Sequence, residues 1–177
     1  MTPPEPDRSD LPSAELPGDP SVADRLRRQL IRNLDAVGLH RELRPPLYDA
    51  MCGSVSAGTA ARKLGAGCDV LAPGQRGCPY HFHHAQEEMF VILEGWGTLR
   101  VAGEFLPLRA GDVVFIPPGP EHPHQIINTS DAPLRYLSIS TQERPEVCEY
   151  PDSAKLSISG RGVYRQADSV DYWEAEP

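Results

Sequence analysis

The sequence HFHHAQEEMFVILEG, residues 81–95, places His81 and His83 a few residues before Glu88 in one short stretch. If this segment is a strand, His81 and His83 point the same way, because strand side chains alternate between the two faces of a sheet. A second stretch, GDVVFIPPGPEHPH at residues 111–124, adds two more histidines. Imidazole nitrogens and carboxylate oxygens suit divalent first-row metals such as Fe(II), Mn(II), Zn(II) or Ni(II). The two stretches together predict a metal site of three histidines and one glutamate.

The composition of the 177 residues is typical of a globular domain, with 40% hydrophobic and 24% charged residues. A formal net charge of −8 argues against a nucleic-acid partner, which would require a basic surface. No secretory leader and no apolar run long enough to span a bilayer is evident. We therefore expect a cytoplasmic protein with no membrane or nucleic-acid partner. The cysteines show no CxxC spacing and do not indicate a disulfide framework.

The N-terminal region divides into a tail and a helix. Residues 1–20 contain six prolines and few large apolar side chains, which indicates a flexible tail. Ser21 is a good N-cap, Asp24 falls in the first helical turn, and apolar residues then recur at helical spacing. The helix should end near Gly38. Residues 21–47 are therefore expected to form a helix and a linker.

Short strand-like runs separated by glycine and proline turns occupy the middle of the chain. The expected strands cover residues 68–72, 81–83, 88–93, 97–102, 104–108, 112–116, 125–128 and 134–140. Many short strands with frequent turns indicate a sandwich or barrel, here over residues 48–147. Strand 88–93 is apolar on both faces, which predicts burial on both sides. Residues 148–177 are polar and are expected to wrap the barrel as an irregular extension.

The two histidine stretches resemble the two sequence motifs of the cupin superfamily. The residues that match the first motif are His81, His83, Glu88 and Gly95. Those that match the second are Gly111, Pro117, Gly119 and Asn128, with one histidine between the last two. The region also resembles small bacterial single-domain cupins, of the cupin 2-like conserved-barrel type, that have no assigned reaction. The resemblance implies an all-β fold: a cupin-type double-stranded β-helix, or jelly-roll barrel, with an added N-terminal helix and an irregular C-terminal segment.

The same resemblance implies a function. It favours a metal-binding cupin that holds one divalent ion and acts as a metal-dependent enzyme on a small oxygenated molecule. The reaction would be of the dioxygenase, isomerase or lyase type, and no general acid or base is evident in the sequence. The alternative is a non-catalytic cupin that binds or senses a small molecule, since this fold hosts many functions. Cupins of this size commonly pair through an apolar sheet, so we expect a homodimer.

Two of the expected ligands have a competitor. On an uninterrupted strand Glu87, rather than Glu88, would share a face with the first two histidines. The cupin spacing places a bend after the histidine pair, which favours Glu88. Among the later histidines, His122 lies in a proline-rich loop, whereas His124 opens a strand-like run that would hold its imidazole in a fixed direction. We assign the metal to His81, His83, Glu88 and His124, keep His122 as the alternative, and regard Cys78 as a less favoured soft ligand.

Overall fold

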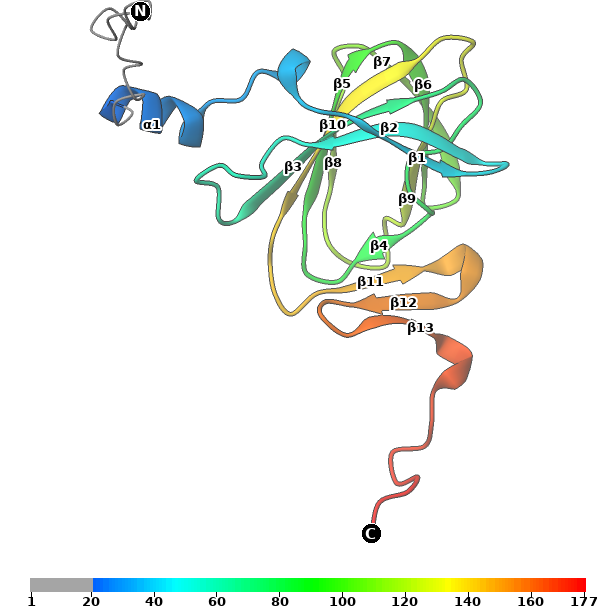
Figure 1. Ribbon diagram of the computed structural model, residues 1–177. Helices are drawn as coiled ribbons and strands as arrows, with labels where there is room; N and C mark the ends of the chain where they lie inside the picture. Colours follow the sequence, from blue (N-terminus) through cyan, green and yellow to red (C-terminus); the bar gives the residue numbers. More distant parts are fainter. Residues whose placement is uncertain (1–20) are drawn as a thin grey trace, which may run out of the picture.

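The computed structural model describes residues 21–177, so the expected flexible tail at residues 1–20 lies outside the described residues. Within these residues the chain is mostly β, with a single α-helix near the N-terminal end, and both features were predicted. Figure 1 shows two facing sheets that close into a barrel, with a third sheet below it and the helix projecting to one side.

The larger barrel sheet has six strands, and the smaller one has three. In spatial order the larger sheet consists of β1 (His40–Arg44), β2 (Tyr48–Ser54), β3 (Leu64–Leu71), β10 (Leu134–Thr141), β5 (Glu88–Glu94) and β8 (Val113–Ile116). The smaller sheet consists of β7 (Glu104–Arg109), β6 (Trp96–Val101) and β9 (His124–Ile127). Neighbouring strands pair antiparallel throughout, which is typical of a jelly-roll barrel.

The hydrophobic core lies between the two sheets. It is formed by alternate residues of each strand, because every second side chain points inward. On β5 the inward residues Phe90 and Ile92 are buried, and Glu88 follows the same alternation at the start of the strand. The core residues are Ala50, Leu71, Phe90, Ile92, Leu99, Leu108, Ile116, Ile126, Leu134 and Tyr136. The outer residues of β5 are only half-buried in the single chain, so the expectation of burial on both faces was wrong for the isolated chain.

The N-terminal helix is shorter than predicted. α1 spans Val22–Leu30 and begins with the expected Ser21 cap, which forms a reciprocal capping box with Asp24. It ends well before Gly38, with Ile31 already extended. Residues 37–39 instead lie against β2, where a side chain at Gly53 would collide with the carbonyl oxygen of Gly38 at 2.7 Å. A short 3-10 turn, Leu34–Ala36, joins the two segments. The apolar side of α1 is exposed, since the helix has no buried residue.

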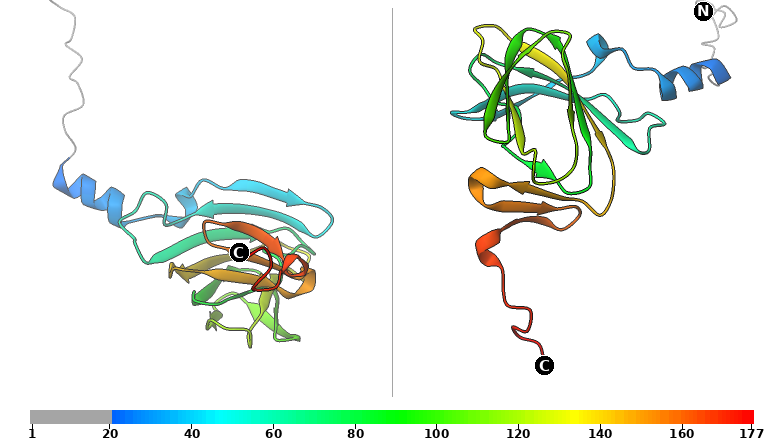
Figure 2. Two further views of the ribbon diagram at one scale, coloured as in Figure 1. Left: turned by 90° about the horizontal axis from the view of Figure 1, so that it is seen from below. Right: turned by 180° about the vertical axis from the view of Figure 1, so that it is seen from behind.

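Two segments contain strands that the sequence analysis missed. Residues 40–44, treated as linker, form β1 at the edge of the larger sheet, and residues 48–54, for which no strand was expected, form β2 beside it. The C-terminal segment is irregular only in part, because a third sheet contains β4 (Phe82–His83), β11 (Val147–Tyr150), β12 (Lys155–Ile158) and β13 (Gly162–Arg165). The right view of Figure 2 shows this sheet below the barrel. The polar composition hid these strands because most of their side chains are half-exposed or exposed.

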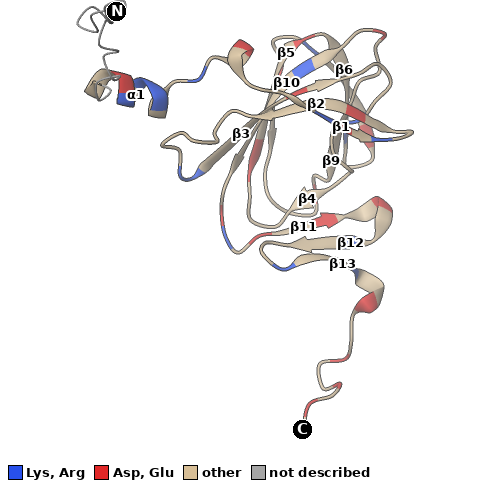
Figure 3. Ribbon diagram, in the orientation of Figure 1, with Lys and Arg blue, Asp and Glu red and all other residues tan. Residues whose placement is uncertain are grey.

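Charged residues are interspersed along the chain (Figure 3). In the described part of the chain, no helix is both long enough and apolar enough to cross a membrane.

Candidate metal centre

Three separate segments place the predicted ligands inside the barrel. His81 and His83 flank Phe82 at β4, Glu88 begins β5, and His124 begins β9. The backbones of His81 and His124 pair directly: each N–H donates to the other carbonyl, at 3.1 and 2.7 Å. This pairing brings the two imidazole centroids to 4.5 Å. The structure therefore brings together two histidine stretches that are distant in the sequence.

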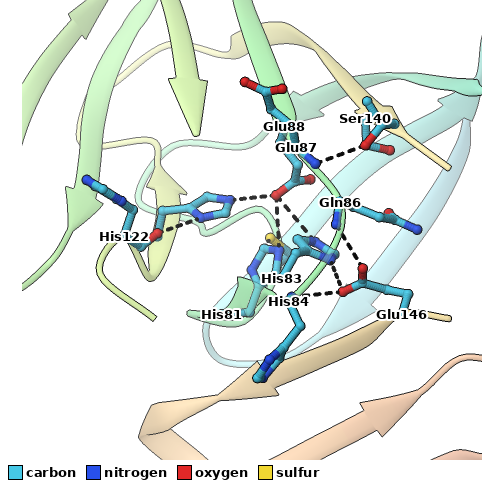
Figure 4. Close-up of polar contacts among 12 residues, drawn as sticks. His81, His83, His84, Gln86, Glu87, Glu88, His122, Ser140 and Glu146 are labelled. Carbon is cyan, nitrogen blue, oxygen red and sulfur yellow. Dashed lines mark hydrogen bonds and ion pairs between the residues drawn. The ribbon is translucent and has the colours of Figure 1, made fainter. Parts of the chain in front are cut away.

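The three imidazoles converge on one carboxylate oxygen (Figure 4). The distances to Oε2 of Glu88 are 3.6 Å from Nε2 of His81, 3.3 Å from Nε2 of His83 and 2.9 Å from Nε2 of His124. The cluster is well shielded, because the side chain of Glu88 is 12% exposed and that of His124 is 1% exposed. Three nitrogens and one oxygen directed at a common point form a donor set that suits a divalent transition metal.

The second nitrogen of each imidazole has its own acceptor. Nδ1 of His81 lies 2.8 Å from the carbonyl oxygen of Pro79, and Nδ1 of His124 lies 3.2 Å from that of His122. Nδ1 of His83 lies 3.1 Å from Oε1 of Glu146. An acceptor at Nδ1 favours the proton on that atom, which leaves the Nε2 lone pair directed at Glu88. This is the tautomer that a metal-ligating histidine needs.

Two buried atoms of the cluster lack a hydrogen-bond partner. They are Oε2 of Glu88 and Nε2 of His124, which approach each other closely but not in the direction of a hydrogen bond. Buried polar atoms are rarely left unpaired, because desolvation without a partner costs about 1–3 kcal/mol. A cation between these atoms would satisfy both. The residues present therefore fit a divalent metal ion.

The pKa values of Glu88 and His81 also indicate that the cluster favours a positive charge. Burial would raise the pKa of Glu88, but the contacts with His124, His81 and His83 outweigh burial and lower that pKa well below its usual range. Burial would lower the pKa of His81, but its contacts with Cys78 and Glu88 raise that pKa to about 11. The ionised carboxylate thus favours a positive charge beside it. A bound divalent ion would supply this charge.

Glu146 is a site residue that the sequence analysis missed. Its buried carboxylate accepts from His83 and from three successive backbone N–H groups, those of His84, Ala85 and Gln86, at 3.2, 3.1 and 2.9 Å. These bonds hold the chain in a loop after β4, so the strand alternation restarts at β5. No signal near the histidines could have identified Glu146, because it comes from the segment before β11.

The structure separates the expected ligands from their competitors. The side chain of Glu87 is exposed, whereas that of Glu88 lies in the cluster. His122 is exposed and lines an apolar cavity of about 420 Å³ between β6, β7 and β8. Cys78 lies 3.5 Å from Nδ1 of His81, which is the nitrogen that does not face Glu88. The geometry thus favours the assigned residues over all three competitors.

A second donor group overlaps the first. His81, His83 and Cys148 also have ligand atoms within 4.8 Å of one another, and Cys148 was not expected in the site. Burial raises the pKa of the Cys148 thiol, which disfavours the thiolate that a metal would require. We therefore favour the group that contains Glu88.

The cluster opens onto a cavity inside the barrel. This cavity has a volume of about 500 Å³, and His81 and Glu88 form part of its wall. Apolar side chains such as Leu71 and Phe90 line it together with several polar ones from β1, β2, β3 and β10. A small molecule in this cavity would lie directly against the cluster.

The fold and the site together define the class of protein. It is a small jelly-roll barrel in which three histidines and a glutamate face an interior cavity. Residues 69–140 match the cupin domain family. This part of the chain is therefore similar to a cupin domain, as the resemblance of its motifs predicted.

Two curated relatives and one solved structure illustrate the similarity. The chain is 38% identical over 60 residues to an uncharacterized protein of Methanocaldococcus jannaschii, covering 34% of this chain and 46% of that protein. It is 36% identical over 59 residues to an oxalate-binding protein of Thermotoga maritima, covering 33% of this chain and 47% of that protein. The chain thus spans just under half the length of these relatives. The crystal structure of a candidate sugar phosphate isomerase from Acidithiobacillus ferrooxidans shares the fold, with a TM-score of 0.72, 24% identity, and 82% of this chain and 97% of that chain covered.

Proposed function

We propose that the chain is a cytoplasmic, metal-dependent enzyme that acts on a small oxygenated molecule. Its site would hold one divalent ion with His81, His83, Glu88 and His124. The single observation that carries this proposal is the convergence of the three Nε2 atoms on Oε2 of Glu88, beside a cavity of about 500 Å³. Four protein ligands on a six-coordinate ion leave two positions for water or substrate.

The residues of the chain would have distinct roles in such a reaction. A divalent ion, when bound, supplies Lewis acidity to an oxygen of the substrate. The three imidazoles and Glu88 hold the ion, and Glu146 orients His83. The apolar side chains of the cavity wall, such as Leu71 and Phe90, would reduce the contact of the substrate with water, which strengthens electrostatic interactions there. This arrangement supports a reaction of the isomerase, lyase or dioxygenase type.

The proposal is tested by metal analysis followed by a screen of defined probes. The full chain is purified, its metal content is measured, and it is loaded separately with Mn(II), Zn(II), Ni(II) and Fe(II). Dihydroxyacetone in D2O reports proton exchange by NMR, oxaloacetate reports carbon–carbon cleavage, and catechol, cysteine and pyruvate report O2 consumption with Fe(II). We expect near-stoichiometric metal and turnover in one assay.

A matched pair of variants controls this test. Glu88→Gln should lose both metal and turnover, whereas Glu87→Gln, on the neighbouring exposed residue, should keep both. Absence of bound metal after loading, or equal behaviour of the two variants, would contradict the proposal.

A second candidate function is binding without catalysis. The similarity to an oxalate-binding protein favours it. Calorimetry of the metal-loaded chain with oxalate distinguishes the two functions. Metal-dependent oxalate binding together with no turnover of any probe would favour a binding or sensing protein over an enzyme.

We also propose that the chain forms a homodimer through an outer apolar patch. This patch consists of the outward side chains of three adjacent strands: Met89, Val91, Val113, Phe115, Leu137 and Ile139. Two of them are largely exposed in the single chain, Val113 by 47% and Phe115 by 67%. Contiguous exposed apolar patches commonly mark protein–protein interfaces. A second copy would cover this face.

A charge in the outer apolar patch should separate the subunits. We expect Phe115→Glu to be monomeric at micromolar concentration in sedimentation velocity, where the unaltered chain is dimeric, because dimerisation would bury the new carboxylate. Phe105→Glu serves as the control, since Phe105 is 63% exposed on β7 of the other sheet. A monomeric unaltered chain, or dissociation by both variants, would remove this assignment.

A further inference from the structure

A second polar group lines the interior cavity away from the three histidines. Asp69 on β3 is paired in register with Cys52 on β2 and with Tyr136 on β10. The hydroxyl of Ser138 donates to Oδ2 of Asp69 at 3.0 Å. Asp69, Cys52, Tyr136 and Ser138 all line the same cavity as His81 and Glu88. A molecule that fills this cavity would therefore contact both the metal cluster and the carboxyl group of Asp69.

The environment of Asp69 raises the pKa of its carboxyl group. Burial raises the pKa of Asp69, and the negative charge of Glu42 adds to this, while hydrogen bonds with Cys52 and Ser138 partly oppose it. Within residues 21–177 no lysine or arginine forms an ion pair with Asp69, in contrast to Asp49, which binds Arg41 at 2.7 Å. The titratable groups that face Asp69 on the packed strands, or lie around the same cavity, are Cys52, Tyr136, Glu42, Arg44, Tyr48, Cys78, His81 and Glu88.

We infer that Asp69 is the catalytic residue that transfers the proton at this site, and that the substrate is a small carbonyl compound with a hydrogen on the neighbouring carbon. This inference rests on the proposed function and narrows it to enolisation. A carboxyl group with a raised pKa is a stronger base than an ordinary aspartate once it is ionised, and it lies in the wall of the substrate cavity.

The step balances without any further reactant. The carbon–hydrogen bond next to the carbonyl breaks, and its proton passes to the carboxylate of Asp69. The electron pair of that bond forms the carbon–carbon double bond of an enolate, and the former carbonyl oxygen takes the negative charge. Where the carbon that lost the proton carries a hydroxyl group, transfer of that hydroxyl proton to the former carbonyl oxygen and return of the Asp69 proton to the former carbonyl carbon complete an isomerisation. Return of the proton to the original carbon produces only exchange with solvent.

The experiment measures deuterium incorporation from D2O into dihydroxyacetone by the Zn(II)-loaded full chain, across a range of pH. Asp69→Asn replaces the carboxyl group by an amide of the same shape. We expect exchange to fall by about 10²–10⁴-fold, the usual contribution of a general acid or base. Asp49→Asn is the matched control. Asp49 is a partly exposed aspartate of the same sheet, it binds Arg41, and it does not line the cavity. This control should retain exchange within about twofold, as expected of a surface change.

A second variant tests the role through the pH profile. Ser138→Ala removes a hydrogen bond that lowers the pKa of Asp69 but leaves its carboxyl group in place. Exchange should rise with pH as Asp69 ionises, and in Ser138→Ala this rise should move to higher pH. If Asp69 only supported the fold, Ser138→Ala would not shift the pH profile of exchange. If Asp69→Asn does not fold, the Ser138→Ala profile alone decides the inference, and an unchanged profile overturns it.

The outcomes distinguish the two levels of the proposal. Normal exchange by Asp69→Asn overturns the role of Asp69 and leaves metal-dependent catalysis standing. Metal binding without exchange by the unaltered chain overturns enolisation, and with it this role. A carbon-13 NMR titration of the Asp69 carboxyl group gives an independent readout. A midpoint at or below that of an ordinary aspartate, about 3.9, would also overturn the inference.

Discussion

Replacing His124 with alanine should remove most of the bound metal. The imidazole of His124 is 1% exposed, and its Nε2 lies 2.9 Å from Oε2 of Glu88 without a hydrogen-bond partner. Four-ligand zinc sites bind with an apparent free energy of about 10–16 kcal/mol, so loss of one ligand should weaken binding by at least about 100-fold. The measurement is metal content after dialysis, together with a competition titration against a chelator.

His122→Ala is the matched control for this prediction. The two histidines are close in sequence, but the side chain of His122 is exposed and only its carbonyl oxygen contacts His124. The control should therefore retain full metal content, since a backbone carbonyl survives the substitution. Circular dichroism must show that both variants are folded, and His124→Gln replaces His124→Ala if the smaller side chain destabilises the core. Metal retention in the His124 variants with loss in His122→Ala would reverse the assignment.

Replacing Glu146 with alanine should weaken both metal binding and the fold. The carboxylate accepts from three backbone N–H groups and from Nδ1 of His83, and it is buried. Each buried donor left without a partner costs about 1–3 kcal/mol, so the free energy of unfolding should fall by several kcal/mol. Loss of a carboxylate that orients a ligating histidine typically reduces metal affinity by about 10–100-fold. Urea unfolding of the metal-free chain and a metal titration measure the two effects.

Glu143→Ala is the control for Glu146→Ala. Both glutamates precede β11, but the side chain of Glu143 is exposed. Its effect on both quantities should be small, as expected for a surface site. Equal stability and equal metal affinity in the two variants would show that Glu146 neither holds the loop nor orients His83. A drop in stability with unchanged affinity would restrict Glu146 to the loop.

Much of the fold could be predicted from local sequence. The alternation of apolar side chains identified most barrel strands, and Ser21 marked the start of α1. The strands that escaped prediction are β1, β2 and the C-terminal strands β11–β13, whose side chains are mostly exposed or half-exposed. Such strands are held by backbone hydrogen bonds to their neighbours. These bonds do not require particular side chains, so the sequence shows no apolar alternation that would predict them.

The candidate site, like the fold, could be predicted from the sequence only in part. By itself the amino-acid sequence determined the kinds of donor atoms and the spacing of His81 and His83, because residues two apart on a strand share a face. Tertiary contacts determined the rest. The bonds of Glu146 to the loop after β4 restart the alternation so that Glu88 points inward, and the backbone pairing of His81 with His124 selects the third imidazole. Asp69 reaches the same cavity only because β3 and β10 pair within the barrel. These choices depend on which strands become neighbours, and that is a property of the whole folded chain, because the free energy that selects one pairing is spread over many contacts.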